Sequence, residues 1–324
     1  MSESTHGCDS GSALSRRLRV YTSGNYRWTA RMRVGFPCRA WAKHLKSPRP
    51  DGLGGYERVI PVILQCKEWG LRYFNLPSET IGWGDYSKYK PGLQEMEEKF
   101  GELLAQIRNA SETADVMLSM HAAAYNVPTS DDPVVLERSL REIVVMQRAL
   151  EMCGGSVLYL HPGYGGKDAA AACARLVGRL SSLPASSIPL GIETSGVGLG
   201  DLDTVLHLAS AIPGALPVMD FGHLYGLGWS LGTINDYTNL FERARLLSGK
   251  YIFTHFSAVS GRKHIPLEGN LPDFRVFARA AAAFERQGNQ QLVVLIESPR
   301  RELDALLFRG GFQRALAAAQ VRRT

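Results

Sequence analysis

Short apolar runs alternate with longer amphipathic stretches from Met32 to the end of the chain. The apolar runs cover residues 33–38, 71–76, 116–120, 156–161, 189–193, 216–220, 250–255 and 292–297. The amphipathic stretches fall near residues 57–69, 92–109, 133–153, 168–181, 202–211, 234–247, 273–287 and 303–319. Strands that alternate with helices form parallel βα units, and eight such units close a barrel. We therefore predict an α/β fold, a single-domain (β/α)8 TIM barrel over residues 32–324.

The first 31 residues do not share this pattern. Residues 1–31 are rich in Ser, Thr, Gly and Arg and lack apolar periodicity, and Met32 immediately precedes the first strand. We predict that they are a disordered extension or the product of a start codon placed too early, and we exclude them from the fold. An Arg-rich, acid-poor targeting peptide is the functional alternative.

Composition narrows the class of protein. The 324 residues hold five cysteines, an odd and scattered set without a CxxC pair, which argues against a disulfide framework and suits a reducing, cytoplasmic compartment. No apolar run reaches the roughly 20 residues needed to cross a bilayer, so no membrane association is expected. The net charge of +6 permits a polyanionic partner, although part of this excess lies in residues 1–31.

Two glycine-rich stretches follow strands without forming a nucleotide-binding motif. HPGYGGKD (161–168) lacks the spacing and the Ser or Thr of a phosphate-binding P-loop, and GVGLGD (196–201) is not the G-x-G-x-x-G of dinucleotide-binding proteins. We interpret both as loops at the top of the barrel that leave room for a bulky substrate.

Six of the eight predicted strands end in a side chain able to bind a metal. The segments are LSMHAAAY (His121), LYLHPGYGG (His161), PLGIETSG (Glu193), PVMDFGHLYG (Asp220 and His223), YIFTHFSA (His255) and VVLIESP (Glu297). His264 also falls near a barrel-top position. Catalytic side chains of this fold come from the C-terminal ends of several strands. A single such histidine is more often structural, so the prediction depends on the coincidence of all of them.

The carboxylates in this set point to more than one ion. Burying Glu193, Asp220 or Glu297 without a partner would cost several kcal/mol, and cations remove that cost. Imidazole and carboxylate ligands suit Zn²⁺ or a similar divalent transition metal, and too many converge for one tetrahedral ion. A central carboxylate such as Glu193 can bridge two ions roughly 3.5–4 Å apart, a separation that suits phosphoryl displacement. Glu193 is therefore the predicted catalytic residue.

At these residues the sequence resembles a known family. The matching motifs are His121, His161-Pro-Gly, Ile-Glu193-Thr, Asp220-Phe-Gly-His223, His255-Phe-Ser, Lys263-His264-Ile-Pro-Leu and Glu297-Ser-Pro. They are similar to the endonuclease IV (AP endonuclease family 2) barrel, in its archaeal-type branch, from about Met32 to Asp304. VGFPC and LSMHAAAYNVPTSDDPVVLERSL are in addition similar to the UV damage endonucleases. Both families are metal-dependent and nick DNA 5′ to a damaged site.

The resemblance implies a ligand set for two to three Zn²⁺ ions, with Mn²⁺ as the other candidate. It assigns one ion to His121, His161 and Glu193, a second to Glu193, Asp220, His255 and Glu297, and a third to His223 and His264. Three positions depart from the families. Arg262 stands where endonuclease IV has the Asp of its Asp-x-His pair, Ala124 replaces the Gln of the UV damage enzymes' Gln-Tyr pair, and Phe253 replaces their Lys.

Aromatic and basic residues near the predicted mouth are candidate DNA contacts. Tyr125 and Asn126 follow His121 on a loop from which they can enter a damaged duplex. The segment ETIGWGDYSKYK places Trp83 among tyrosines and lysines, a mixture that suits groove insertion and phosphate contacts as well as an ordinary amphipathic loop. Lys263 lies close enough to the mouth to meet a phosphate, although surface lysines usually meet only water.

Three hypotheses follow. The first is a monomeric DNA repair endonuclease that hydrolyses the phosphodiester 5′ to an abasic or otherwise damaged site of double-stranded DNA by metal-bound hydroxide. The second is a xylose-isomerase-like sugar isomerase or epimerase, which would need fewer histidines. The third is a degenerate barrel that binds DNA or a protein. The number of bound ions separates the first two, because one ion favours the isomerase and two or three favour the nuclease.

Overall fold

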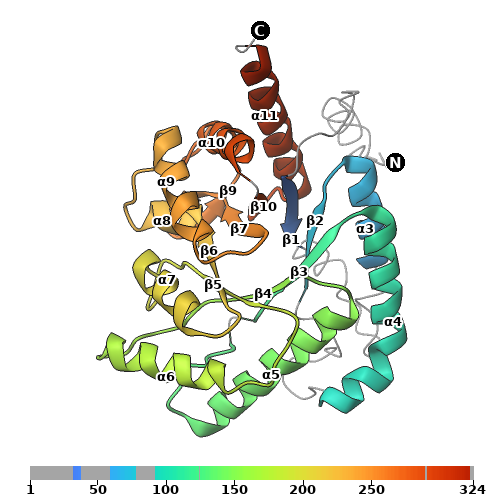
Figure 1. Cartoon of the computed structure of the whole chain (residues 1–324), viewed down its shortest axis with the longest axis vertical. Coiled ribbons are helices and arrows are strands. Elements are labelled where there is room, and N and C mark those ends of the chain that lie inside the picture. Colours follow the sequence, from blue (N-terminus) through green and yellow to red (C-terminus); the bar gives the residue numbers. More distant parts are fainter. Residues whose placement is uncertain (1–31, 38–58, 78–91, 124, 289, 322–324) are drawn as a thin grey trace, which may run out of the picture.

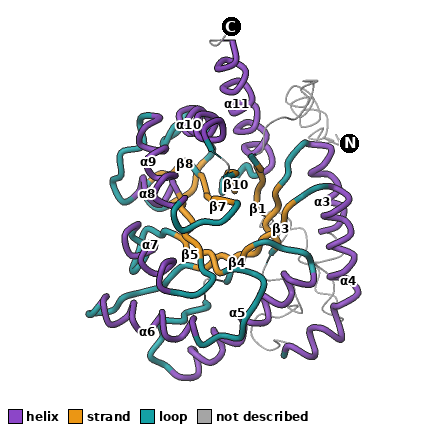
Figure 2. Tube along the Cα trace, in the orientation of Figure 1, coloured by secondary structure: helices purple, strands orange, loops and turns teal. Residues whose placement is uncertain are grey.

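Eight parallel strands form a closed ring at the centre of the molecule (Figures 1 and 2). The computed structural model describes residues 32–37, 59–77, 92–123, 125–288 and 290–321. The strands are β1 (Arg33–Pro37), β2 (Tyr73–Leu76), β3 (Met117–His121), β4 (Val157–Leu160), β5 (Leu190–Glu193), β6 (Leu216–Asp220), β7 (Tyr251–Phe256) and β10 (Gln291–Ile296). They are ordered β1-β10-β7-β6-β5-β4-β3-β2, with β1 and β2 paired to close the ring. The predicted (β/α)8 barrel is confirmed.

Helices surround the ring on its outer side (Figure 1). They are α3 (Val59–Trp69), α4 (Leu93–Ala114), α5 (Pro133–Met152), α6 (Ala169–Ser181), α7 (Leu202–Ala211), α9 (Ile234–Arg245), α10 (Phe274–Gln287) and α11 (Glu302–Val321). Local capping explains where several of them begin. The Asp132 carboxylate accepts hydrogen bonds from the Val134 and Val135 amides at 2.8 and 3.2 Å, and Asp201 caps α7 in the same way.

Two elements were not expected from the sequence. The short helix α8 (Phe221–Gly226) begins directly after β6, and the strands β8 (Ala258–Ser260) and β9 (Lys263–Ile265) form an antiparallel hairpin after β7. His223 therefore lies within α8. The helix begins there because the Asp220 carboxylate accepts the His223 amide at 2.8 Å and acts as its N-cap.

The core has two parts on either side of the strands. Side chains that alternate outward pack against the helices, as in the stacked rings of Phe256 and Phe277, whose centroids are 4.5 Å apart. Inward-facing side chains fill the barrel itself: Tyr73, Val157, Tyr159, Leu216, Val218, Phe253, Val293 and Leu295. Because side chains alternate along a strand, the inward positions above this packed interior are the strand ends that carry the predicted ligands.

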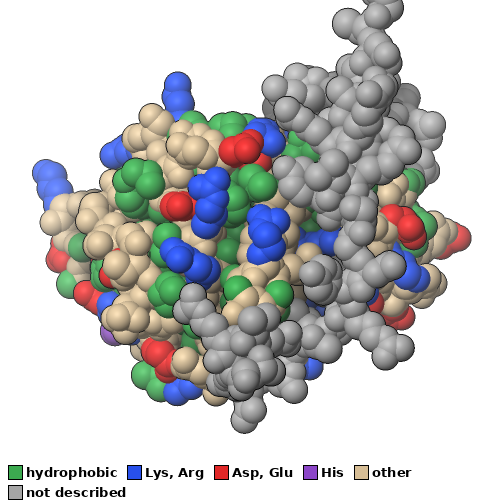
Figure 3. Space-filling model, turned by 90° about the horizontal axis from the view of Figure 1, so that it is seen from above, with side chains coloured by type: hydrophobic (Ala, Val, Ile, Leu, Met, Phe, Trp, Pro, Cys, Tyr) green, Lys and Arg blue, Asp and Glu red, His purple; other side chains and the backbone are tan. Residues whose placement is uncertain are grey.

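Figure 3 shows the molecule from above, and on this face Lys and Arg side chains lie among apolar ones. Arg275, Arg279 and Arg286 are exposed along α10.

Among the described residues, no helix is long and apolar enough to span a membrane. Residues 1–31 and Trp83 lie outside the described residues, so the boundary at residue 32 and the role of Trp83 stay predictions.

Candidate metal centre

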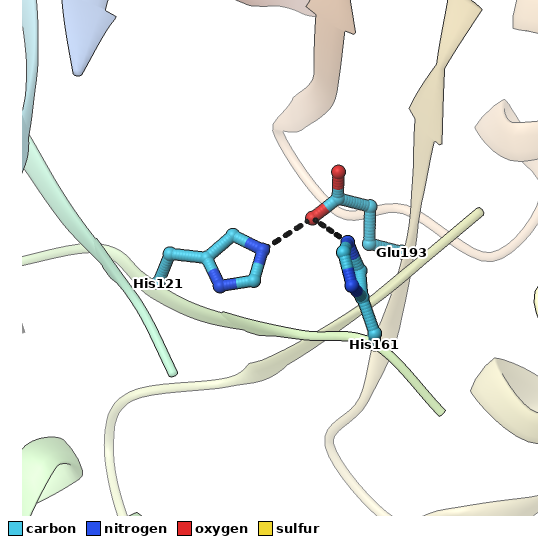
Figure 4. Close-up of side chains that lie close together, drawn as sticks. All are labelled: His121, His161 and Glu193. Carbon is cyan, nitrogen blue, oxygen red and sulfur yellow. Dashed lines mark hydrogen bonds and ion pairs between the residues drawn. The ribbon is translucent and has the colours of Figure 1, made fainter. Parts of the chain in front are cut away.

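The strand ends of β3, β4 and β5 bring together one group of three ligands. Nε2 of His121 lies 2.8 Å and Nε2 of His161 lies 3.5 Å from the same Glu193 carboxylate oxygen, Oε2. Figure 4 shows both imidazoles turned toward that oxygen. Nδ1 of His121 lies 2.7 Å from the carbonyl oxygen of Ala122. A carbonyl only accepts, so Nδ1 carries a proton, and Nε2, which faces Glu193, is the atom that would bind a metal after losing its own proton.

A second group adjoins the first through Glu193. Its other carboxylate oxygen, Oε1, lies 2.9 Å from Nδ1 of His255, and Asp220 completes the group. Glu193, Asp220 and His255 are all buried, with exposed fractions of 1 %, 0 % and 0 %. The Asp220 backbone is held by the Thr194 hydroxyl, which accepts the Asp220 amide at 2.8 Å. Glu193 thus faces both groups with different oxygen atoms.

A third group adjoins the second through Asp220. It contains Asp220, His223 from α8 and His264 from β9, so the structure adds a carboxylate to the two histidines predicted for this position. Glu297 lies between the second and third groups, with Oε1 3.5 Å from Nδ1 of His255 and Oε2 3.7 Å from Nδ1 of His264. All eight predicted ligands therefore converge at the C-terminal end of the barrel.

The donor atoms in this cluster fit metal ions. Among the described residues, Asp220 Oδ2, His255 Nε2 and His161 Nε2 are buried and have no hydrogen-bond partner. Buried polar atoms are normally paired, and each unpaired one costs free energy. A lone pair on imidazole or carboxylate is satisfied by a cation as well as by a proton. The three groups can thus hold divalent ions of the transition series, and Glu193 and Asp220 are each placed to serve two of them.

The ionisable groups of this cluster stabilise each other's charges. Burial opposes ionisation of Glu193, but the positive charges of the surrounding imidazoles, His255 first, outweigh it and hold the pKa of this carboxyl well below its usual range. Burial alone would lower the pKa of His255, yet the charge of Glu193 and the hydrogen bond to it raise that pKa to about 9. The pKa of His121 is raised against burial for the same reason. Carboxylate and imidazolium charges therefore stabilise one another within the cluster.

Sequence reasoning missed two sets of residues next to the ligands. Below the cluster, a chain of buried side chains joins Tyr159, Tyr73, Ser119 and Asn75 by hydrogen bonds. Beside it, the fully buried Asp304 of α11 accepts the Leu267 amide at 3.0 Å and the Ser298 hydroxyl. The one available signal was a polar residue within an apolar strand, as Asn75 is in YFNLP. Asp304 and Ser298 have no such signal, because their partners lie in other elements.

The candidate DNA contacts occupy different settings. The Asn126 side-chain amide donates to the Glu142 carboxylate of α5 at 2.8 Å, and the Arg138 guanidinium lies 6.0 Å from the centre of the Tyr125 ring. Both side chains are half-buried against α5. Lys263 is exposed on β9, next to the ligand His264. Phe253, at the position of the lysine of the UV damage enzymes, packs inside the barrel with its ring 6.1 Å from that of Tyr159.

Comparison with known proteins agrees with this barrel. The family model described as "Xylose isomerase-like TIM barrel" matches residues 63–317, and the chain belongs to this family. An uncharacterised protein of Methanocaldococcus jannaschii is 29 % identical over 215 residues, which are 60 % of this chain and 76 % of that protein.

Solved structures of two chemical classes share the fold. The crystal structure of SacUVDE, a UV damage endonuclease, superposes with a TM-score of 0.71 at 17 % identity and covers 89 % of this chain and 99 % of that one. An L-ribulose 3-epimerase gives 0.60 at 13 % identity, with 90 % and 98 % covered. Endonuclease IV from Thermus thermophilus gives 0.53 at 14 % identity, with 79 % and 94 % covered. At these identities the likeness is one of fold, and it includes both nucleases and sugar epimerases.

Proposed function

We propose that this protein is a metal-dependent DNA repair endonuclease related to endonuclease IV, which hydrolyses the phosphodiester 5′ to an abasic or otherwise damaged site. One observation carries the proposal: the three ligand groups adjoin, because Glu193 belongs to the first two and Asp220 to the last two. Adjacent ions are what phosphoryl displacement requires. A single-ion site would need neither shared carboxylate.

The ligands suggest Zn²⁺, two to three ions, with Mn²⁺ as the other candidate. When bound, such ions activate water and neutralise the charge that develops on phosphate oxygens. The chain itself supplies the orientation. Glu193 is buried and held from both sides by His121 and His255. The Ala122 carbonyl accepts a hydrogen bond from Nδ1 of His121, so the ring is held with Nε2 toward Glu193.

We propose that the substrate is damaged double-stranded DNA. Tyr125 and Lys263 are proposed to contact damaged double-stranded DNA beside the mouth, and the positive net charge of +6 favours approach to a polyanion. Asn126 would join them after release from Glu142. We propose a monomer in the cytoplasm. Among the described residues, Cys153 and Cys173 are free thiols, which suits a reducing compartment.

The test is incision of a labelled duplex that carries one abasic-site analogue, run with and without a chelator beside an undamaged duplex. We expect chelator-sensitive cleavage 5′ to the analogue and an intact control. The Glu193→Gln variant should lose at least about a hundredfold in rate, because the shared carboxylate is removed. Glu102→Gln, on the exposed outer side of α4, is the matched control and should cleave like the parent.

Metal stoichiometry, measured on the same preparation, identifies the alternatives. A protein that binds one ion and leaves the duplex intact would instead be a sugar isomerase or epimerase, and epimerisation of a ketohexose would then be assayed. A protein that binds two or three ions without incision would act on another lesion or phosphodiester. A protein that binds damaged DNA but no ions would be a binding protein built on a degenerate barrel.

A further inference from the structure

Exposed aromatic side chains lie at one end of the barrel. Among the described residues, two Phe, Tyr or Trp side chains are exposed, Tyr164 at 67 % and Trp229 at 36 %, and the others are buried or half-buried. Tyr164 follows β4, and Trp229 follows β6 and α8, so both lie on connections at the C-terminal end of the barrel, where the metal ligands converge. A single exposed ring needs no explanation, but two at the end that carries the ligands indicate a binding surface.

The backbone around Tyr164 is packed, although its side chain is exposed. The Gly163 carbonyl oxygen accepts the Leu199 amide at 2.9 Å. Neither neighbour has room for a side chain, because a Cβ atom on Gly163 would lie 2.6 Å from the Thr129 hydroxyl oxygen and one on Gly165 would lie 2.8 Å from Leu199 Cδ2. The loops after β3 and β5 therefore hold this loop, and Tyr164 extends from a fixed backbone. A ring held in this way gives contact area at a low cost in conformational entropy.

The backbone of Trp229 is held by the end of α8. Its amide donates to the Leu224 carbonyl oxygen at 3.1 Å. The residue before it, Gly228, has a φ of +91°, a conformation that glycine adopts readily and that turns the chain after the helix. Because Leu224 directly follows the ligand His223, this hydrogen bond keeps the Trp229 backbone close to that ligand.

Both rings therefore start close to metal ligands that adjoin one another. The His161 and His223 rings meet edge-on, with centroids 5.8 Å apart. Tyr164 comes three residues after His161, so their Cα atoms are at most about 11 Å apart. A DNA strand with a phosphate at the ligands has its next nucleotides, up to about three away, within that span.

Cations accompany both rings. Three basic side chains are exposed on the same connections and have no ion-pair partner among the described residues: Lys167, Arg262 and Lys263. Lys167 lies in the loop after β4, whereas Arg262 and Lys263 lie at the turn of the β8–β9 hairpin. This turn lies beside the end of α8 (Figure 1), because a Cβ atom on Gly226 would be 3.5 Å from the Gly261 carbonyl oxygen.

The carboxylates nearest to these cations in the sequence are engaged with other groups. Asp168, which follows Lys167, accepts the Ala171 amide at 2.9 Å as the cap of α6, and Glu268 lies 3.5 Å from the Arg300 guanidinium. Positive charge therefore remains available beside the two rings. Proteins that bind unpaired nucleic-acid strands combine such cations, which meet phosphates, with aromatic rings on which bases stack.

We infer that Tyr164 and Trp229 are substrate-binding residues that stack on bases of the DNA strand lying unstacked beside the lesion. The inference rests on the proposed function and names two further contacts of the same site. Bases inside an intact duplex are stacked on both faces and offer no surface to an aromatic side chain, whereas bases at a damaged site or in a single strand do. The two rings therefore favour damaged or single-stranded DNA over an intact duplex.

Two pairs of substitutions test whether the rings stack on bases. Tyr164→Ala and Trp229→Ala remove a ring, whereas Tyr164→Phe and Trp229→Phe keep one. Binding of a labelled single-stranded thymidine oligonucleotide, measured by fluorescence anisotropy, should weaken about 5- to 100-fold in each alanine variant, as for one lost base stack. The phenylalanine variants should bind close to the parent. If both alanine variants bind as tightly as the parent, the inference is wrong.

The matched control is Leu246→Ala, which removes an 81 % exposed apolar side chain at the end of α9, before β7 and so at the opposite end of the barrel. It should leave the Kd unchanged. Salt dependence separates stacking from charge. The alanine variants of the two rings should keep the parent's slope of log Kd against log salt, whereas Lys263→Ala should reduce that slope by about one. Metal content and melting temperature are measured for each variant, so that loss of ions or of folding is recognised.

A second measurement does not depend on nuclease activity. Tryptophan fluorescence of the parent should be quenched when the unlabelled oligonucleotide is added, because a base stacks on the indole ring, and Trp229→Phe should lack this quenching. Such a result supports the inference even if the parent fails to incise an abasic duplex, in which case the proposed function alone is wrong. Incision of the abasic duplex by both alanine variants with parental affinity would leave the proposed function standing and overturn the inference. An oligonucleotide that does not bind the parent would overturn it as well.

Discussion

The ring nitrogen Nδ1 of His264 lies 2.7 Å from the backbone carbonyl oxygen of Glu297. Because a carbonyl oxygen only accepts, Nδ1 carries the proton and Nε2 is left as the ligand atom. The bond joins the β8–β9 hairpin to the end of β10, which are distant in sequence. The two ligands therefore fix each other's position, as outer hydrogen bonds commonly do around metals.

Asp304 reinforces this junction, and its removal should weaken metal binding. Its carboxylate accepts hydrogen bonds from the Leu267 amide at 3.0 Å and from the Ser298 hydroxyl. Leu267 lies in the segment that follows His264, and Ser298 directly follows Glu297. In Asp304→Ala we expect the ion held by Asp220, His223 and His264 to bind about 10- to 100-fold more weakly. Calorimetric titration of the metal-free protein with Zn²⁺ measures this affinity.

Asp304→Asn is the matched variant, because its amide oxygen can still accept from both donors. It should recover most of the lost affinity. The ion at His121, His161 and Glu193 should be unaffected in both variants, since Asp304 contacts none of these residues. An equal loss at all sites would show that Asp304 acts on global folding and not on this junction.

The sequence was sufficient to predict the barrel and the convergence of the candidate ligands because both depend on local patterns. Each strand is a short apolar run bounded by polar residues, and six of the eight candidate ligands are the residues at which such runs end. Parallel strands that close a barrel bring those ends together, so the convergence of His121 with Glu193, 72 residues apart, follows from topology alone.

Other features depend on contacts that leave no local pattern. Ser119 and Asn75 are each a single polar residue in a strand, and their pairing appears only when β2 and β3 are placed in register. The hairpin that carries His264 is three residues per strand, too short to show alternation. The α8 helix is likewise only six residues long, and its start depends on the Asp220 side chain that also serves the metal groups.

Metal removal should lower stability, and Glu193→Gln should reduce this effect. Ions that bind only the folded chain stabilise it, by about 3 kcal/mol at an ion concentration one hundred times the Kd. The parent should therefore melt at a lower temperature after chelation, as measured by differential scanning calorimetry. In Glu193→Gln the difference between metal-loaded and metal-free protein should shrink, because the carboxylate shared by two groups is lost.

The control for this comparison is Glu102→Gln, whose melting temperature should fall on chelation by the same amount as that of the parent. If Glu193→Gln kept the full shift, the ions would be bound elsewhere and the shared role of Glu193 would be refuted.

Glu151, near the C-terminal end of α5, should make the free energy of unfolding depend on pH. Its carboxylate accepts the Ser187 hydroxyl and amide at 2.6 and 2.9 Å and the Arg148 guanidinium at 3.0 Å. These bonds, the Ser187 hydroxyl first, lower the pKa of Glu151 from 4.5 to about 2. A carboxyl whose pKa is lower in the folded chain stabilises that chain above the unfolded pKa, and the contribution disappears as pH falls through the folded pKa.

The variant Glu151→Gln removes this titration. We expect it to be less stable than the parent at pH 7, with the difference shrinking between about pH 4.5 and pH 2. Urea denaturation of both proteins without metal isolates the effect, because the ligand cluster is common to both and cancels in the difference. For Glu102→Gln, the difference from the parent in the free energy of unfolding should stay constant over the same pH range. If the difference for Glu151→Gln also stayed constant, the Ser187 and Arg148 bonds would not stabilise the charged form of Glu151.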